Sequence, residues 1–479
     1  MTRADIVIVG AGPAGMAAAS VAADLGADVL VLDEQAGPGG QIYRSIEFSD
    51  ALRAGILGED YAAGGILARE FAGKSVRFER AATVWRVDPD GVIAYSRANR
   101  AHRVRAGHVI LATGAQERPV PLPGWTLPGI MTAGAAQIML KSAAIAPRDA
   151  VLAGSGPLLY LLADQLIRAG VPPRALIETQ TVRNHLAAAR HLPGAVVGWR
   201  AIAKGMALLR GIRAAGVERF TACREIRLIG EESATGDARV AGIAFVCGTV
   251  ERRIACSTVL LHQGVVPNTQ ITRSLRLDHV WDDAQRCFRP VLDAWGASSN
   301  PRISVAGDGA SIGGAKAAEA AGRLAALDAA LRIGVIDRDR RDRGAGPLQR
   351  LRGRELAVRP FLDALYAPPL QILQPVDETI VCRCEEVTAG AIRGYAKLGC
   401  VGPNQTKAFG RCGMGPCQGR FCGLTVTEIL AMETGLPHGQ VGAYRIRAPI
   451  KPVTLGEIAS LAGEDETDAA GTPPQNAAT

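Results

Sequence analysis

Four cysteines near the C-terminal end have the number and spacing of ligands in a metal site. One residue separates the members of the first pair, four residues separate those of the second, and 32 residues lie between the pairs: Cys382, Cys384, Cys417 and Cys422. Four thiolates bind either a zinc ion or an iron–sulfur cluster. Zinc stays open, although structural zinc sites usually present pairs with two to four residues between the cysteines. Cys412, five residues before Cys417, competes for a ligand position.

A glycine-rich turn near the N-terminus has the pattern of a dinucleotide-binding site. Residues 10–15 read Gly-Ala-Gly-Pro-Ala-Gly between an apolar β-run and an alanine-rich helical run. The first glycine allows a tight turn, the second lets a pyrophosphate approach the backbone, and the third lets the helix pack on the strand. Two acids follow the second β-run, and either carboxylate can accept a hydrogen bond from a ribose hydroxyl. We expect cofactor contacts at Gly10, Gly12, Pro13, Ala14, Gly15, Asp33 and Glu34.

A second glycine turn, at residues 154–159, is an imperfect copy of the first. Gly154 and Gly156 are in place, but Leu159 stands where the third small residue belongs. A larger side chain there pushes the helix away from the strand and narrows the approach to a pyrophosphate. Glu178, at the end of the next β-run, can still accept from a ribose. This turn therefore predicts an NAD(P) site, a site for another adenine nucleotide, or a domain that is structural only.

Composition excludes several classes of protein. Hydrophobic residues make up 48% of the chain and charged residues 21%, which is typical of a globular protein and excludes wholesale disorder. The net charge of +8, from 54 basic and 46 acidic residues, is spread along the chain and is no nucleic-acid footprint. No uninterrupted apolar stretch has the 18 to 20 residues that a transmembrane helix needs. We expect a cytoplasmic protein, with peripheral contact at the inner membrane as a further hypothesis.

Three later motifs resemble those of the two-dinucleotide-domain flavoproteins, the superfamily that includes the pyridine nucleotide-disulfide reductases. They are Leu111-Ala112-Thr113-Gly114, Gly307-Asp308-Gly309 and Gly39-Gly40-Gln41. The resemblance implies FAD, with the Asp308 carboxylate on the ribityl chain and the Gly40 loop near the isoalloxazine. It adds Gly40, Gln41, Thr113, Gly114, Gly307 and Asp308 to the expected cofactor site. Disulfide reduction is not expected, because the first cysteine of the chain is Cys223 and no redox pair follows Gly40.

The order of these motifs predicts the architecture that positions them. We expect an α/β fold in which an FAD-binding Rossmann-like domain is interrupted by a second Rossmann-like nucleotide domain and followed by a small helical cysteine module. The expected boundaries are 1–118 and 265–335 for the FAD-binding domain, 119–264 for the inserted domain, 336–375 for an arginine-rich connector, 376–435 for the cysteine module, and 436–479 for a C-terminal extension with a disordered acidic tail. The connector is interpreted either as a solvated linking element or as a docking or phosphate-facing patch.

Over nearly its full length the chain resembles the A subunits of bacterial opine oxidases. The motifs that carry the resemblance include Cys382-Arg383-Cys384-Glu385-Glu386-Val387-Thr388 and Pro403-Asn404-Gln405-Thr406-Lys407. Related subunits occur in hydrogen cyanide synthase, D-hydroxyproline dehydrogenase and heteromeric sarcosine oxidase. The cysteine module is similar to bacterioferritin-associated ferredoxin, which implies a 2Fe-2S cluster on Cys382, Cys384, Cys417 and Cys422.

The opine oxidase resemblance implies an electron-transfer subunit of a flavin-dependent oxidoreductase acting on CH-NH donors. A separate flavoprotein subunit, related to glycine and D-amino-acid oxidases, would convert a secondary amine to an imine that water hydrolyses. Electrons would then pass through the FAD and 2Fe-2S centres of this chain to a quinone or another acceptor. An FMN at the subunit interface and a small third subunit are further expectations.

Two other functional classes remain open at this stage. One is a self-contained NAD(P)H-dependent oxidoreductase or ferredoxin reductase, in which the second nucleotide domain binds NAD(P). The other is an assembly scaffold whose cofactors are inert. No residue of the chain has the features of an acid–base catalyst for amine oxidation, so none is assigned a catalytic role.

Overall fold

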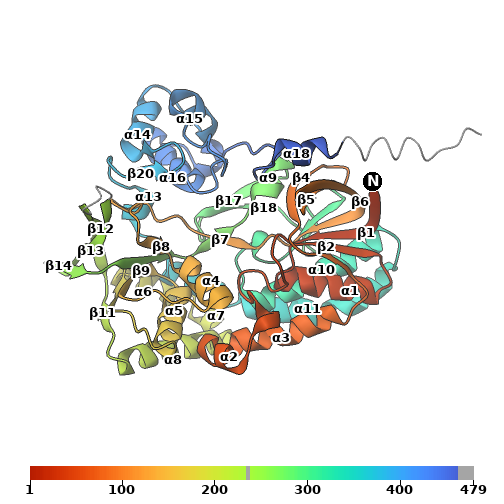
Figure 1. The fold of residues 1–479 in the computed structure, drawn as a ribbon, viewed down its shortest axis with the longest axis horizontal. Coiled ribbons are helices and arrows are strands. Elements are labelled where there is room, and N and C mark those ends of the chain that lie inside the picture. Colours follow the sequence, from red (N-terminus) through yellow and green to blue (C-terminus); the bar gives the residue numbers. More distant parts are fainter. Residues whose placement is uncertain (233–237, 462–479) are drawn as a thin grey trace, which may run out of the picture.

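The computed structural model describes residues 1–232 and 238–461 and contains one mixed and one parallel β-sheet with helices on their faces, and a small helical module (Figure 1). The fold class agrees with the sequence prediction. The predicted domain boundaries stay predictions, and the acidic tail predicted at residues 463–479 lies outside the described residues. No helix among the residues that the structure describes is long and apolar enough to cross a membrane.

The first sheet contains the N-terminal glycine turn and has the strand order β3-β2-β1-β6-β5-β4, with β19 also pairing with β6. Pairing is parallel except between β4, β5 and β6. Its strands are β1 (Thr2–Val9), β2 (Val29–Leu32), β3 (Arg77–Glu79), β4 (Thr83–Val87), β5 (Val92–Arg97), β6 (Arg100–Leu111) and β19 (Ile303–Val305). Its helices are α1 (Pro13–Asp24), α2 (Ala51–Leu57), α3 (Glu59–Ala72) and α10 (Ala315–Arg332), with 3-10 turns at Ile46–Phe48 and Gly307–Gly309.

The second sheet carries the imperfect glycine turn and has the order β11-β10-β9-β15-β8, all parallel. Its strands are β8 (Ile130–Thr132), β9 (Ala150–Ser155), β10 (Ala175–Glu178), β11 (Glu218–Phe220) and β15 (Thr258–Gln263). Its helices are α4 (Ala133–Ala143), α5 (Pro157–Arg168), α6 (Val182–Ala189), α7 (Leu192–Val197) and α8 (Trp199–Ala214). An antiparallel sheet shares its hydrophobic core and consists of β12 (Cys223–Glu232), β13 (Ala238–Cys247) and β14 (Val250–Ala255).

Short elements join the sheets to the C-terminal module. Strands β7 (Ala115–Glu117) and β16 (Val265–Pro267) pair where the chain leaves and re-enters the first domain, and β17 (His279–Asp282) pairs with β18 (Cys287–Pro290). The connecting helices are α9 (Gln270–Ser274), α11 (Arg338–Leu356), α12 (Arg359–Leu365) and α13 (Leu370–Leu373). The module and its extension contain β20 (Ile380–Cys382), β21 (Val387–Thr388), α14 (Ala389–Lys397), α15 (Pro403–Gly410), α16 (Gly423–Thr434), α17 (His438–Val441) and α18 (Leu455–Ala459).

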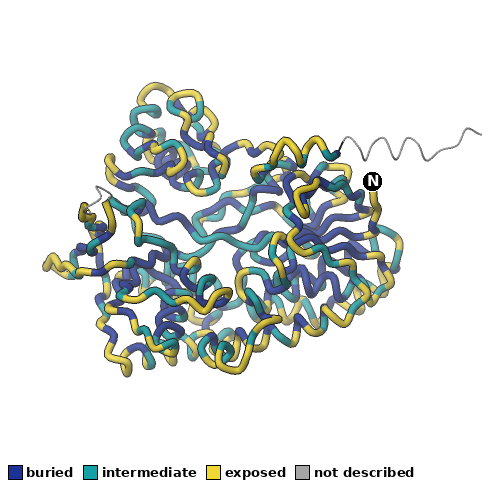
Figure 2. The backbone as a smooth tube through the Cα atoms, in the orientation of Figure 1, coloured by how far each residue is buried: buried dark blue, intermediate teal, exposed yellow. Residues whose placement is uncertain are grey.

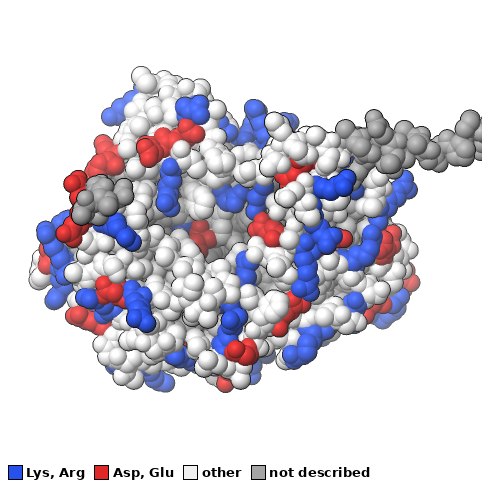
Figure 3. Space-filling model, in the orientation of Figure 1, with Lys and Arg blue, Asp and Glu red and all other residues white. Residues whose placement is uncertain are grey.

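Burial follows this layering. The strands of both sheets are largely buried and the outer helices are exposed (Figure 2). One hydrophobic cluster contains residues of the first sheet and residues of the cysteine module, so the module packs on the FAD-type domain as part of one core. Charged side chains of both signs are dispersed over the face in Figure 3.

The arginine-rich connector is mainly helix α11, which packs along α10. Arg341 donates to the Asp328 carboxylate at 3.0 Å and its guanidinium lies 4.0 Å from the Trp295 ring centroid. These contacts fit the prediction of a linking element for this part of the connector.

Close contact between α1 and α10 depends on small residues. A Cβ on Gly322 of α10 would lie 2.0 Å from the carbonyl oxygen of Ala14 on α1, far inside van der Waals contact. The two helices can therefore meet at this distance only if residue 322 has no side chain, and this contact fixes the helix that begins at the N-terminal glycine turn.

Gly322→Ala is expected to lower the stability of the protein by about 1–3 kcal/mol, because the added methyl group forces α1 and α10 apart. Gly353→Ala on α11 is the matched control, since a Cβ there meets nothing within 4 Å. Thermal unfolding of the two variants measures the difference. Equal midpoints for both variants would contradict the close helix contact.

Candidate functional site

A cavity of about 1910 Å³ runs from the N-terminal glycine turn to the cysteine module. Its volume is roughly twice the upper end of the usual range for small-molecule sites, about 1,000 Å³, so it has room for an extended dinucleotide. It is lined by these predicted cofactor residues: Gly10, Gly12, Pro13, Ala14, Asp33, Glu34, Gly40, Gln41, Thr113, Gly114 and Asp308. The two remaining glycines of the predicted FAD site, Gly15 and Gly307, do not line the cavity. The backbone of Gly15 packs against the Gly10 carbonyl oxygen, and that of Gly307 against the Ala14 side chain.

The turn is built from backbone that leaves no room for side chains. A Cβ on Gly10 would lie 2.5 Å from the Ala112 carbonyl oxygen, and a Cβ on Gly40 would lie 2.9 Å from the Gly12 Cα. Both glycines have positive φ, 104° and 59°. A Cβ on Gly12, by contrast, would meet only the Gly40 Cα, at 3.8 Å. Gly12 therefore presents open backbone to the cavity at the N-terminus of α1, which is where a pyrophosphate binds in this type of fold.

The two acids after β2 have different environments. Asp33 accepts a hydrogen bond from the Ala11 amide at 2.5 Å and from the Gln35 amide at 2.7 Å. Burial raises the pKa of Asp33, and these two hydrogen bonds oppose that shift. Glu34 is more exposed and pairs with Lys451 through one oxygen. Asp33 therefore holds the glycine turn, and Glu34 keeps a carboxylate oxygen for a ligand hydroxyl.

The carboxylate of Asp308 is fixed at the start of α10. It accepts hydrogen bonds from the Gly313 and Gly314 amides at 2.9 and 3.0 Å. A Cβ on Gly307 would lie 2.8 Å from the Ala14 Cβ, so this turn also packs directly against α1. The late Gly-Asp motif is thereby brought to the same cavity as the N-terminal turn, as the sequence predicts.

Of the second glycine turn, only Leu158 lines this cavity, and Gly154, Gly156 and Glu178 do not. Glu178 is buried and pairs with Arg219, whose Nη2 donates to both carboxylate oxygens at 2.9 Å. The His262 imidazole lies 3.1 Å from the position of a Cβ on Gly156 and bonds through Nδ1 to Glu117 at 2.8 Å. The predicted ribose acceptor is thus already bound to an arginine, and an imidazole packs against the turn.

Leu159 explains why the two turns differ. At the matching position in the first turn, a Cβ on Gly15 would lie 1.8 Å from the Gly10 carbonyl oxygen. Leu159 carries a whole side chain and is fully buried, so α5 cannot approach its strand as closely as α1 does. The structure of this turn agrees with the sequence argument about its third position, and the occupant of the site stays a prediction.

Five cysteine sulfurs gather in the cysteine module. The Sγ atoms of Cys382, Cys412 and Cys422 all lie within 4.8 Å of one another and are buried. The Sγ atoms of Cys384 and Cys417 are 3.9 Å apart. Side-chain hydrogen bonds from Cys412 and Cys422 lower the pKa of Cys382 to about 2. Two of the predicted ligands, Cys382 and Cys422, thus lie beside Cys412, the thiol that the sequence analysis named as a competitor, and the other two, Cys384 and Cys417, form a pair.

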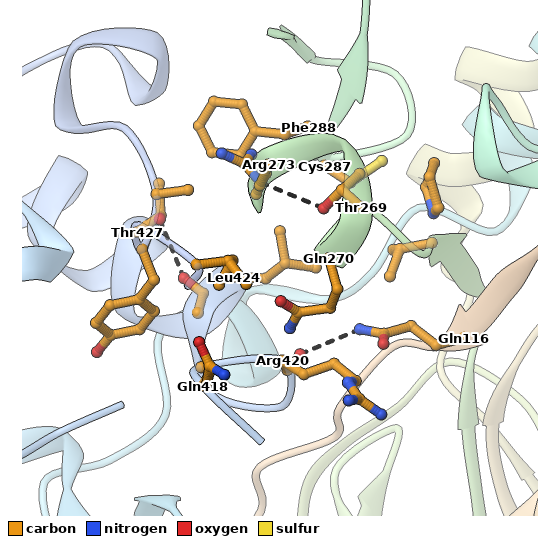
Figure 4. A pocket seen from close by; sticks show the side chains of 17 residues that line it. Gln116, Thr269, Gln270, Arg273, Cys287, Phe288, Gln418, Arg420, Leu424 and Thr427 are labelled. Atoms are coloured by element: carbon orange, nitrogen blue, oxygen red, sulfur yellow. Dashed lines mark hydrogen bonds between the residues drawn. The ribbon is translucent and has the colours of Figure 1, made fainter. Parts of the chain in front are cut away.

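The cysteine loop, residues 411–422, is hydrogen-bonded to the FAD-type domain. Gln116 of β7 donates to the Arg420 carbonyl oxygen at 3.1 Å (Figure 4). Gln270 of α9 donates to the Cys417 carbonyl oxygen at 3.4 Å. Arg420 also lines the large cavity, as does Arg383 beside Cys384. Side chains next to the predicted metal ligands and the glycine turn thus share one cavity.

Lys141 of α4 is a residue that the sequence analysis missed. Its Nζ donates to the carbonyl oxygens of Gln41 and Ile42 at 3.1 and 2.9 Å, and to the Gln137 amide oxygen at 2.8 Å. Burial, with a smaller contribution from Arg44, lowers the pKa of Lys141 to about 7. Three acceptors match the three donors of the ammonium form, so the geometry favours the charged lysine. Lys141 fixes the Gly40 loop to the inserted domain, and no local sequence motif marks it.

The residues present fit the expected cofactors. The crowded glycine cradle has space for a pyrophosphate and no space for side chains, which suits FAD. The sulfurs of five cysteines form a donor set that a soft metal ion or an iron–sulfur cluster prefers. No carboxylate or imidazole belongs to the one candidate metal-binding group found among the described residues.

Comparisons with known proteins agree with this organisation. The family model "Pyridine nucleotide-disulphide oxidoreductase" matches residues 4–325, and "Sarcosine oxidase A3 domain" matches residues 377–463. The A subunit of opine oxidase from Rhizobium meliloti is 45% identical over 95% of this chain and 87% of its own length. Hydrogen cyanide synthase subunit HcnB of Pseudomonas aeruginosa is 33% identical over 96% of this chain and 99% of its own length. Among solved structures, L-proline dehydrogenase from P. horikoshii has a TM-score of 0.69 and 17% identity over 95% of this chain and 79% of that chain, which shows a shared fold.

Glu34→Gln is expected to weaken FAD binding roughly 10- to 150-fold, because a hydrogen bond to a charged acceptor contributes about 1.5–3 kcal/mol. Asp33→Asn is the comparison, since its carboxylate accepts from the glycine turn and its loss should lower the thermal midpoint. Fluorescence titration of the apoprotein with FAD measures the first effect and calorimetry the second. Unchanged FAD affinity in Glu34→Gln would contradict the assignment.

Proposed function

The chain belongs to the family of opine oxidase A subunits and is a flavin-dependent oxidoreductase, and from this premise we propose that it is the electron-transfer subunit of a heteromeric amine oxidase. The substrates proposed are opines or related secondary amino acids. The amine binds on a partner flavoprotein subunit, where it loses a hydride and a proton to give an imine. Water then cleaves the imine. This chain receives the two electrons and passes them to an acceptor.

The proposal assigns FAD to the glycine cradle and a 2Fe-2S cluster to the cysteine module. Gly12 and the N-terminus of α1 bind the pyrophosphate, Glu34 the ribose, and Asp308 the ribityl chain. Four thiolates from Cys382, Cys384, Cys417 and Cys422 hold the cluster. When bound, FAD accepts electrons in pairs and the cluster transfers them singly, which is the chemistry that a relay between an amine and a one-electron acceptor requires.

The observation that carries the proposal is the direct contact between the two cofactor regions. Gln116 lies two residues after Gly114 of the FAD motif and donates to the Arg420 carbonyl oxygen at 3.1 Å. Arg420 itself lies between Cys417 and Cys422. This hydrogen bond joins the two segments that would hold FAD and the cluster, so the bound groups could exchange electrons without a domain movement.

The contacts of the second glycine turn argue against NAD(P)H as the electron donor. A ribose needs an accessible carboxylate, whereas Glu178 is 1% exposed and pairs with Arg219. The electrons are therefore proposed to come from the partner subunit. The inserted domain is proposed to serve in positioning, because its Lys141 holds the loop at Gln41 and Ile42.

Further components are proposed from the family. They are an FMN at the interface with a flavoprotein related to glycine and D-amino-acid oxidases, a small third subunit, and a quinone as acceptor. Arg383 and Arg420 support the FMN, because both line the end of the cavity beside the cysteines and a guanidinium binds phosphate bidentately. The connector arginines support it less, since Arg341 is already paired with Asp328.

A quinone dissolves in the lipid bilayer, so we propose that the protein is cytoplasmic and binds peripherally to the membrane. Helices α6 to α8 support this proposal: residues 182–214 contain six Lys and Arg residues and no Asp or Glu. The same helices expose large hydrophobic side chains, namely Val182, Leu186, Leu192, Val196, Val197, Trp199 and Met206. Basic and apolar side chains on one set of helices fit an anionic lipid surface. These helices lie in the lower left part of Figure 1.

The function is tested on the complex of this chain with its flavoprotein partner, purified without oxygen. Adding octopine, nopaline, sarcosine or hydroxyproline is expected to bleach the flavin and cluster absorption for one of the four. NADH added to this chain alone is expected to leave both unchanged. If NADH reduces the isolated chain and none of the amines reduces the complex, the chain is a pyridine-nucleotide-dependent reductase.

Membrane contact is tested with vesicles of phosphatidylglycerol and of phosphatidylcholine. The protein is expected to sediment with the anionic vesicles only, and the double variant Val196→Ser/Trp199→Ser is expected to bind at least about tenfold more weakly, since each buried side chain contributes about 1.5–3 kcal/mol. Leu455→Ser, which changes an exposed leucine on α18, is the control. Equal binding by the double variant and the control would contradict a role for these helices.

A further inference from the structure

Five of the six cysteine sulfurs of the module form two groups, and the sixth, that of Cys400, hydrogen-bonds to the Gly402 carbonyl oxygen. Cys384 and Cys417 form a pair with a Sγ–Sγ distance of 3.9 Å. The second group is a trio whose sulfurs all lie within 4.8 Å of one another: Cys382, Cys412 and Cys422. A 2Fe-2S cluster takes four protein thiolates, two on each iron. These two groups therefore contain one thiol more than the cluster needs, and the surplus is in the trio.

The pair has the geometry of two ligands on one metal ion. Two thiolates on a tetrahedral ion with metal–sulfur bonds of about 2.3 Å stand roughly 3.8 Å apart, close to the distance between Cys384 and Cys417. No other described cysteine belongs to this pair. Close packing holds it, because a Cβ on Gly415 would lie 2.2 Å from the Cys384 Cβ.

In the trio, Cys382 is set apart from the other two. Its Sγ accepts a hydrogen bond from the Gly413 amide at 3.5 Å, which orients the sulfur as an acceptor. Cys382 is the last residue of β20 and lies two residues before Cys384, a member of the pair. Cys382 is thus held as a ligand by its own backbone surroundings, and the competition for the last position lies between Cys412 and Cys422.

Cys412 is held in place independently of any metal. Its carbonyl oxygen accepts from the Tyr444 hydroxyl at 3.0 Å, and the Tyr444 oxygen can accept in turn from the Thr406 hydroxyl at 2.8 Å. Cys422 is held separately, at the start of α16. Two anchored thiols therefore lie on different segments within ligand distance of the same place.

We propose that Cys412 is a reserve ligand that can replace Cys422 on the cluster. This inference rests on the proposed function, because it requires the cluster. In the exchange, the Cys412 thiol loses its proton as its sulfur binds iron, and the released Cys422 thiolate takes up a proton. The oxidation state of the iron does not change. Both sulfurs are buried, so the exchange needs no thiol from solution.

The test uses alanine variants, since alanine offers no ligand atom. Cys422→Ala and Cys412→Ala are each expected to retain more than about half of the wild-type iron and acid-labile sulfide, whereas the double variant Cys412→Ala/Cys422→Ala loses nearly all of it. Cys417→Ala, the matched control from the pair, loses the cluster as a single variant. The reduced Cys422→Ala protein is expected to give an electron paramagnetic resonance signal with g values shifted from those of the wild type.

Flavin absorption and the thermal midpoint are recorded for every variant, so that loss of a cluster is separated from loss of the fold. If Cys422→Ala keeps its FAD and midpoint but loses iron as completely as Cys417→Ala, the reserve-ligand inference is wrong and the proposed function stands. If the wild-type protein contains no iron and labile sulfide, the cluster itself is wrong and both proposals fail.

Discussion

The hydrogen bonds between the FAD-type domain and the cysteine loop are the contacts on which the proposed function depends. Gln116 of β7, before the inserted domain, and Gln270 of α9, after it, donate to the carbonyl oxygens of Arg420 and Cys417. One hydrophobic cluster runs through the first sheet and the cysteine module. The two cofactor regions are therefore parts of one packed body, and neither needs a domain movement to reach the other.

Backbone crowding sets the position of the cofactor in that body. Gly10, Gly15 and Gly322 lie where a Cβ would meet a carbonyl oxygen at 2.5, 1.8 and 2.0 Å. These distances hold α1 against both its strand and α10, so that its N-terminus points at the cavity. The inserted domain has a similar glycine turn that is less tightly packed because Leu159 replaces the third glycine. Its Lys141 holds the Gly40 loop through the carbonyl oxygens of Gln41 and Ile42.

Functional residues could be predicted from the sequence where they belong to a local sequence motif. The glycine turn at residues 10–15 could be predicted from its spacing, and the late Asp308 motif from its resemblance to the two-dinucleotide-domain flavoproteins; the structure brings both to one cavity. The different roles of Asp33 and Glu34 could not be predicted, since they depend on which carboxylate meets the Ala11 amide. Gln116 and Arg420 are 304 residues apart, and no local signal marks a contact of that kind. Cys412 was visible as an extra thiol, but only folding brings its sulfur into the trio.

The proposed electron transfer requires that this chain bind both a flavin and an iron–sulfur cluster. Metal and acid-labile sulfide analysis of the chain, purified without oxygen together with its flavin, tests it most directly. We expect FAD as the bound flavin, and iron and acid-labile sulfide in equal amounts. Zinc without labile sulfide would contradict it, because a structural zinc site cannot accept electrons from the flavin.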